Sequence, residues 1–211
     1  MRLPPQLKSV TGAIAVVTTI VSLLILLIDR DGVTSLLMGF IPARLGGTLV
    51  LSPAVPAILT PLSATLVHAS LLHLGGNLLM LVWCGLAVER VLGGRSVVLL
   101  YLVGAFAAAA AQYLVAPTSA NPVVGASGAI SALIGAYALC YGQHRQIVTS
   151  RLLNRWLNVA WLLVAWVLIQ FGFGYVMGQQ GMLLATPAHI GGFIAGVAMQ
   201  RPLLLWRYRK A

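Results

Sequence analysis

Long apolar stretches without a charged residue dominate the sequence. They cover roughly residues 10–28, 71–88, 96–116, 127–142, 156–176 and 186–200. A helix needs about 20 residues to cross the hydrocarbon core of a bilayer, and the fourth and sixth stretches are the shortest. The pattern predicts an all-α, polytopic membrane protein with a bundle of six transmembrane helices.

The segment between the first two stretches, residues 29–70, is a long connection. It contains four prolines and an apolar run over residues 36–41, so we expect it to lie in or on the membrane surface. The first stretch is long for the core of a signal peptide and has no small-residue cleavage site, which indicates a retained helix. Without internal repeats or low-complexity segments, residues 1–211 are expected to form a single membrane domain.

Composition supports the membrane class. Hydrophobic residues make up 60% of the chain and charged residues 8%, about a third of the usual share. So few charges cannot cover a water-soluble fold of this size. Cys84 and Cys140 fall within apolar runs and need no role beyond that of small buried side chains.

The net charge of +10 is explained by membrane topology. If the N-terminus is cytoplasmic, eleven of the thirteen basic residues fall on the inner side, and only Arg30 and Arg44 fall on the outer side. The positive-inside rule then predicts cytoplasmic N- and C-termini. No nucleic-acid partner is needed, and the inner basic residues are expected to attract anionic membrane lipid.

Polar side chains within membrane helices are costly and are candidates for function. His73 and Asn77 are four residues apart and share a face of the second helix, and His68 lies just before it. His189 lies near the start of the sixth helix. These residues are expected at one level, because the second and sixth helices run in the same direction.

A second signal is the sequence Gly125-Ala126-Ser127-Gly128 at the start of the fourth helix. Glycines allow a backbone or a substrate to approach closely, and unpaired N–H groups at a helix N-terminus can stabilise an oxyanion. The fourth helix runs parallel to the second and sixth, so Ser127 is expected at the level of His189. A serine, histidines and an asparagine at one level match the needs of nucleophilic acyl transfer.

Small residues predict that the fourth and sixth helices pack closely. Ser127, Ser131 and Gly135 repeat at intervals of four on the fourth helix. Gly192 and Gly196 continue the face of His189 on the sixth. If the two stripes face each other, His189 can reach Ser127.

Four motifs follow one another along the chain: His68-Ala69-Ser70-Leu71-Leu72-His73 with Asn77, Ala87-Val88-Glu89-Arg90 with Gly93, Gly125-Ala126-Ser127-Gly128, and Ala188-His189-Ile190-Gly191-Gly192 with Gly196. In this order and on these helices, the sequence resembles the rhomboid family of intramembrane serine proteases, in its six-helix bacterial form. The resemblance extends from the long connection to the last helix.

The resemblance implies a role for each matching residue. Ser127 would be the nucleophile and His189 the general base, and Asn77 and His73 would hold the oxyanion with the backbone N–H of Ser127. His68 would be a structural histidine, and Glu89 would anchor the inner end of the second helix. Gly125, Gly128, Gly192 and Gly196 would provide close packing near the site.

The resemblance also implies the setting. The protein would be an integral protein of a bacterial inner membrane, with its active site toward the outer side and no cofactor. Its substrates would be single-span membrane proteins with small residues at the scissile bond.

The sequence departs from the family pattern at two places. The family often has an aromatic residue four positions after the serine, stacked on the catalytic histidine, whereas this chain has Ser131. Some members carry a Trp-Arg pair in the long connection, where this chain has Phe40-Ile41-Pro42-Ala43-Arg44.

The three acidic residues limit the mechanism. Glu89 is 16 residues from His73, or about 24 Å along a helix, and therefore near the opposite side of the membrane. Asp29 and Asp31 lie at the end of the first helix. A Ser-His dyad is therefore expected, an aspartyl protease is excluded, and the absence of HExxH argues against a zinc site.

Two other functions remain open at this point. A catalytically inactive rhomboid-like protein could bind membrane clients, for which Ser131 is the only argument. A small transporter could use the three membrane histidines, although internal repeats are missing. We interpret His144 as a loop residue, and Trp156, Trp161 and Trp166 as lipid-facing or interfacial anchors of the fifth helix.

Overall fold

The computed structural model of the protein describes residues 9–29, 31–141, 148–176 and 185–209. The interpretation of His144 as a loop residue lies outside these ranges. So do several of the basic residues that entered the charge count: Arg2, Lys8, Arg30, Arg145 and Lys210.

Six long helices coincide closely with the six apolar stretches. They are α1 (Val10–Ile28), α5 (Leu71–Leu92), α6 (Gly94–Val115), α7 (Ser127–Tyr141), α8 (Arg151–Val176) and α10 (Thr186–Arg207). Among the described residues, α1, α5, α6 and the Arg151–Ile169 part of α8 are long and apolar enough to cross a membrane. The prediction of an all-helical fold with membrane-spanning helices is therefore confirmed.

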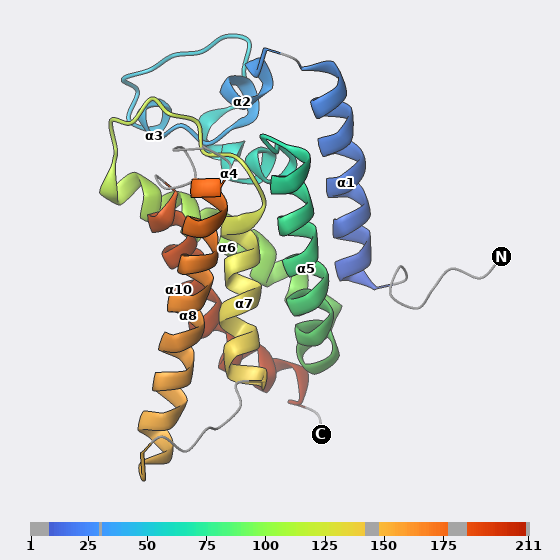
Figure 1. Ribbon diagram of the computed structural model, residues 1–211, viewed down its shortest axis with the longest axis vertical. Coiled ribbons are helices and arrows are strands. Elements are labelled where there is room, and N and C mark those ends of the chain that lie inside the picture. Colours follow the sequence, from blue (N-terminus) through green and yellow to red (C-terminus); the bar gives the residue numbers. More distant parts are fainter. Residues whose placement is uncertain (1–8, 30, 142–147, 177–184, 210–211) are drawn as a thin grey trace, which may run out of the picture.

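Helix α7 occupies the centre of the bundle. Ten of its 15 residues are buried, and it packs against α5, α6, α8 and α10. In Figure 1, α1 lies on one flank beside α5, and α8 lies on the other flank. The helix that begins with Ser127 is thus enclosed by other helices along most of its length.

Helix α1 buries its polar side chains and exposes its apolar ones. Thr11, Thr18 and Ser22 are buried toward the bundle, whereas Ile20, Leu24 and Leu27 are more than half exposed. Such a helix would be unstable in water, because its apolar face has no protein partner. The distribution is typical of a helix whose outer face contacts lipid.

Glu89 near the end of α5 holds the start of α1. Its carboxylate accepts hydrogen bonds from the backbone N–H groups of Val10 and Thr11, both at 2.9 Å, and from the Thr11 hydroxyl at 2.6 Å. A carboxylate at a helix N-terminus pairs N–H groups that have no partner within the helix. This acid therefore ties two helices together at the end of the bundle opposite to Ser127.

The described part of the connection after α1, residues 31–70, is structured. It contains α2 (Val33–Met38), α3 (Pro42–Leu45), η2 (Ala57–Leu59), α4 (Thr60–Ser63) and η3 (Ala64–Leu66), gathered at one end of the bundle (Figure 1).

Part of this segment is buried inside the protein. Phe40 and Ile41 are at most 2% exposed, because an antiparallel bridge between Phe40 and Val123 draws the segment onto the loop before α7. These two side chains therefore belong to the protein interior, and the position of the segment at the membrane surface stays a prediction. Leu36, 42% exposed, faces outward.

Helices α7 and α10 approach until their backbones touch. A Cβ atom on Gly196 would overlap the carbonyl oxygen of Ala132, and one on Gly192 would overlap that of Gly128. On the opposite helix, a Cβ on Gly135 would overlap the carbonyl oxygen of Phe193. The small-residue stripes of the two helices face each other.

We predict that Gly196→Ala destabilises the fold, because the added methyl group must push the two backbones apart. The expected loss is about 1–3 kcal/mol, the usual range for overpacking. Gly172→Ala in α8 is the matched control, since a Cβ there would meet nothing within 4 Å and alanine favours a helix. Denaturant-induced unfolding in one detergent, followed by circular dichroism, measures both; equal midpoints for the two variants would contradict the prediction.

Candidate active site

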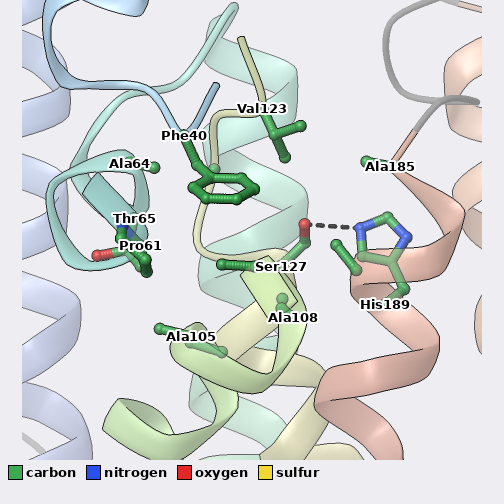
Figure 2. Close-up of a pocket in the computed structure, with 15 residues that line it drawn as sticks. Phe40, Pro61, Ala64, Thr65, Ala105, Ala108, Val123, Ser127, Ala185 and His189 are labelled. Atoms are coloured by element: carbon green, nitrogen blue, oxygen red, sulfur yellow. Dashed lines mark hydrogen bonds between the residues drawn. The ribbon is translucent and has the colours of Figure 1, made fainter. Parts of the chain in front are cut away.

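Ser127 and His189 form a hydrogen-bonded pair. Ser127 is the first residue of α7, and His189 lies in the first turn of α10. Their side chains point toward each other in Figure 2, with 2.8 Å between Ser127 Oγ and His189 Nε2. Both residues are buried. This distance allows a proton to pass from the hydroxyl to the imidazole.

Gly125 shapes the loop that leads to Ser127. Its φ of +108° lies in a region that only glycine adopts readily. Its N–H donates to the carbonyl oxygen of Ala64 at 2.9 Å, which joins the loop to the 29–70 segment. A Cβ on Gly125 would come within 2.7 Å of His73 Nε2. Glycine therefore serves both the backbone turn and the approach of His73.

His73 and Asn77 lie on the buried face of α5 beside this loop, as their spacing predicts. The Asn77 amide donates one N–H to the carbonyl oxygen of His73 at 3.0 Å and retains a second. His73 Nδ1 and Asn77 Oδ1 are buried and have no hydrogen-bond partner within the described part of the chain. Buried polar atoms are normally paired, so the two side chains mark a place where a polar ligand or water can bind.

His68 connects α1 to the residue before Ser127. The Ser22 hydroxyl donates its single proton to the carbonyl oxygen of Leu66 at 2.8 Å, so His68 Nδ1 must donate to Ser22 Oγ, 2.9 Å away. His68 Nε2 is then an acceptor and faces the Ala126 N–H at 3.5 Å. Burial lowers the pKa of His68 to about 3, which keeps the ring in this neutral form near pH 7.

Trp166 of α8 is buried beside the pair, and its prediction as a lipid-facing anchor was wrong. It is 4% exposed, whereas Trp156 and Trp161 are 50% and 65% exposed. A helix turns about 100° per residue, so tryptophans at intervals of five lie on three different faces. Only the face of Trp166 meets α7 and α10.

Trp166 contacts both partner helices at the site. Its indole N–H donates to Ser131 Oγ at 2.8 Å. Its ring lies edge-on to that of His189, with 6.2 Å between centroids and 66° between planes. The position that often holds an aromatic residue in the resembled family is thus a serine that binds an aromatic residue from another helix.

A small cavity of about 30 Å³ adjoins Ser127 and His189. Phe40 covers it on the side of the 29–70 segment, and alanines of α6 narrow it (Figure 2). Most of the side chains that line it, including these alanines, are small: Pro61, Ala64, Thr65, Ala105, Ala108, Ala109, Ala129, Ala185 and Ala188. The space beside the serine can hold only a small group.

Comparison with known proteins gives consistent results. A family model described as "Rhomboid domain" matches residues 57–206. Mouse "Rhomboid-related protein 2" is 32% identical over 139 residues, covering 65% of this chain and 45% of that protein. "Rhomboid protease GluP" of Bacillus subtilis (strain 168) is 29% identical over 139 residues, covering 66% of this chain and 24% of that protein. The matches therefore span less than half the length of these curated relatives.

We predict that Ser22→Ala destabilises the loop before Ser127, because Leu66 and His68 each lose a hydrogen-bond partner in a buried place. The expected cost is about 1–3 kcal/mol. Thr19→Ala is the matched control, since that hydroxyl bonds only to Ala15 of its own helix. Unfolding midpoints and hydrogen exchange of the Ala126 amide measure the effect; unchanged exchange in Ser22→Ala would exclude the link through His68.

Proposed function

The chain belongs to the rhomboid family, and we propose that it is an intramembrane serine endopeptidase that cleaves transmembrane segments of other membrane proteins. The observation that carries the proposal is the 2.8 Å hydrogen bond between Ser127 Oγ and His189 Nε2, at the N-terminus of the central helix. Ser127 is the proposed nucleophile and His189 the proposed general base.

The proposed topology is six transmembrane helices with cytoplasmic termini and the site toward the outer side of a bacterial inner membrane. The distribution of basic residues supports this orientation. Helix α7 has 15 residues and is about 22 Å long, shorter than a hydrocarbon core of about 30 Å. If its Tyr141 end lies near the inner surface, Ser127 lies several Å below the outer surface and needs a hydrated access route.

In the proposed reaction, Ser127 Oγ attacks the carbonyl carbon of the scissile peptide bond. His189 Nε2 accepts the hydroxyl proton and then donates it to the leaving amine, which frees the first product. Water, deprotonated by the same nitrogen, attacks the acyl-enzyme ester and releases the second product. The serine proton is restored in that step.

The proposed oxyanion donors come from α7 and α5. The N–H groups of Ser127, Gly128 and Ala129 precede the first backbone bond of α7, which Ile130 makes to Ala126, and one N–H of Asn77 remains after its bond to His73. His73 lies against Gly125, two residues before the serine. Donors fixed before the reaction stabilise the developing charge at little cost in reorganisation.

A Ser-His dyad without a carboxylate fits the other contacts. Glu89 binds the start of α1. The Asp29 carboxylate accepts hydrogen bonds from the N–H groups of Val33 at 3.0 Å and Thr34 at 2.7 Å, and its hydrogen bonds with Thr34 hold its pKa below the usual value. Both acids are thus engaged at helix N-termini.

The proposed substrates are single-span membrane proteins with a small residue at the scissile bond. The cavity of about 30 Å³ beside Ser127 supports this, because a large side chain would clash with its alanine walls. The alternative of an inactive client-binding protein was based on Ser131. The ring of Trp166 beside His189 weakens that argument.

We predict that a fluorophosphonate probe labels the purified protein in detergent and that Ser127→Ala and His189→Ala each reduce the labelling rate by at least about a hundredfold. Ser35→Ala in α2 is the serine control and should label normally. The same three variants are compared for cleavage of a single-span reporter in liposomes. Absent labelling and cleavage by folded wild type would refute the proposed function.

A further inference from the structure

We infer that Trp166 is a positioning residue for His189, held against the imidazole ring by Ser131 across the interface between α8 and α7. The inference deepens the proposed function and rests on it for its consequence in catalysis. Three contacts carry it: an indole hydrogen bond, a serine hydrogen bond and an edge-on ring contact.

The hydrogen bonds have one consistent direction. Ser131 Oγ donates its single proton to the carbonyl oxygen of Ser127 at 2.7 Å. Its lone pairs therefore face outward from α7, and one accepts the indole N–H of Trp166 at 2.8 Å. The chain of donors runs from Trp166 through Ser131 to the backbone of Ser127. It fixes the indole relative to the residue that carries the nucleophilic hydroxyl.

Burial makes this arrangement stiff. Trp166, Ser131 and His189 are each at most 4% exposed, so water cannot replace the serine as the acceptor of the indole N–H. A rotation of the imidazole toward α8 would have to displace the indole and break its hydrogen bond. Leaving a buried N–H without a partner is costly. The orientation of His189 is thus coupled to a side chain of a helix that carries neither member of the pair.

Trp161 of the same helix does not share this role. It lies about one and a half turns before Trp166 and is 65% exposed. The two tryptophans have the same size and lie on the same helix. Trp161 therefore provides a control that separates the contact with His189 from the general effect of losing a tryptophan.

The kinetic test compares Trp166→Leu, Trp166→Phe and Trp161→Leu with wild type. Trp166→Leu removes the ring and is expected to lower kcat and the probe-labelling rate by roughly 2- to 12-fold, the range for one aromatic contact. KM should not change, because the ring does not face the cavity. Trp166→Phe keeps a ring and should recover part of the loss, and Trp161→Leu should match wild type.

A second measurement does not need activity. In NMR spectra of histidine-labelled protein, the His189 ring resonance is assigned by its loss in His189→Ala. Trp166→Leu should shift this resonance by removing the ring current, and Trp161→Leu should leave it in place. Ser131→Ala should shift it as well, because the indole loses its fixed acceptor.

The outcomes separate the two proposals. An inactive wild type whose His189 resonance moves in Trp166→Leu and Ser131→Ala would refute the proposed protease but uphold the positioning contact. An active wild type whose kcat and His189 resonance are the same in Trp166→Leu and Trp161→Leu would overturn the role of Trp166 and leave the protease proposal intact. If Trp166→Leu and Trp161→Leu lower the unfolding midpoint equally and neither shifts the His189 resonance, Trp166 is only a packing residue. That result would also overturn the inference.

Discussion

The close contact between α7 and α10 is the constraint on which the site depends. Gly192 lies against the carbonyl oxygen of Gly128, and Gly196 lies against that of Ala132. His189 precedes Gly192 by three residues, on the same face of α10, and Ser127 directly precedes Gly128. The backbone contact that packs the two helices therefore sets the distance between the hydroxyl and the imidazole. A Cβ atom on Gly192 or Gly196 would overlap a backbone carbonyl of α7 and would force the two helices apart.

The start of α7 needs a second support, because a helix end is less constrained than a helix interior. Backbone hydrogen bonds supply it: Gly125 binds Ala64, and Phe40 exchanges two bonds with Val123. His68 adds a side-chain link from Ser22. Each such bond contributes about 0.5–1.5 kcal/mol, and together they tie the loop to the 29–70 segment and to α1. The long segment is thus a structural support for the serine as well as a cover for its cavity.

The buried polar side chains of this apolar chain are explained largely by their hydrogen-bond partners. Several buried ones bind a backbone carbonyl, as Ser22 does at Leu66, and the partly buried Glu89 binds backbone N–H groups at the start of α1. His73 and Asn77 each keep a buried polar atom without a partner among the described residues, as Arg44 and Asn158 do elsewhere. In a low-dielectric interior such atoms are expensive unless something polar binds them. His73 and Asn77 are set apart by their position, because both lie beside Gly125, two residues before Ser127.

The helices, and the helix ends at which the site residues lie, could be predicted from the sequence alone. Long uncharged apolar runs favour helices in a membrane protein, and the six stretches marked α1, α5, α6, α7, α8 and α10 to within seven residues at each end. The spacing placed His73 and Asn77 on one helix face and His189 and Gly192 on another, because the backbone fixes the helical period. The buried stripe of Thr11, Thr18 and Ser22 was also readable in principle, since polar residues in a membrane helix must face protein.

Only the tertiary structure decided which faces meet. Residues 159–169 of α8 are all apolar, so their periodicity could not distinguish Trp166 from Trp161. Phe40 could not be separated from the exposed Leu36 of the same apolar run, because a bridge to Val123, 83 residues away, buries it. The indole N–H of Trp166 required some acceptor, but that acceptor belongs to another helix. The local sequence sets which side chains lie on each helix face. The packing of segments that are distant in the sequence decides which groups those side chains contact.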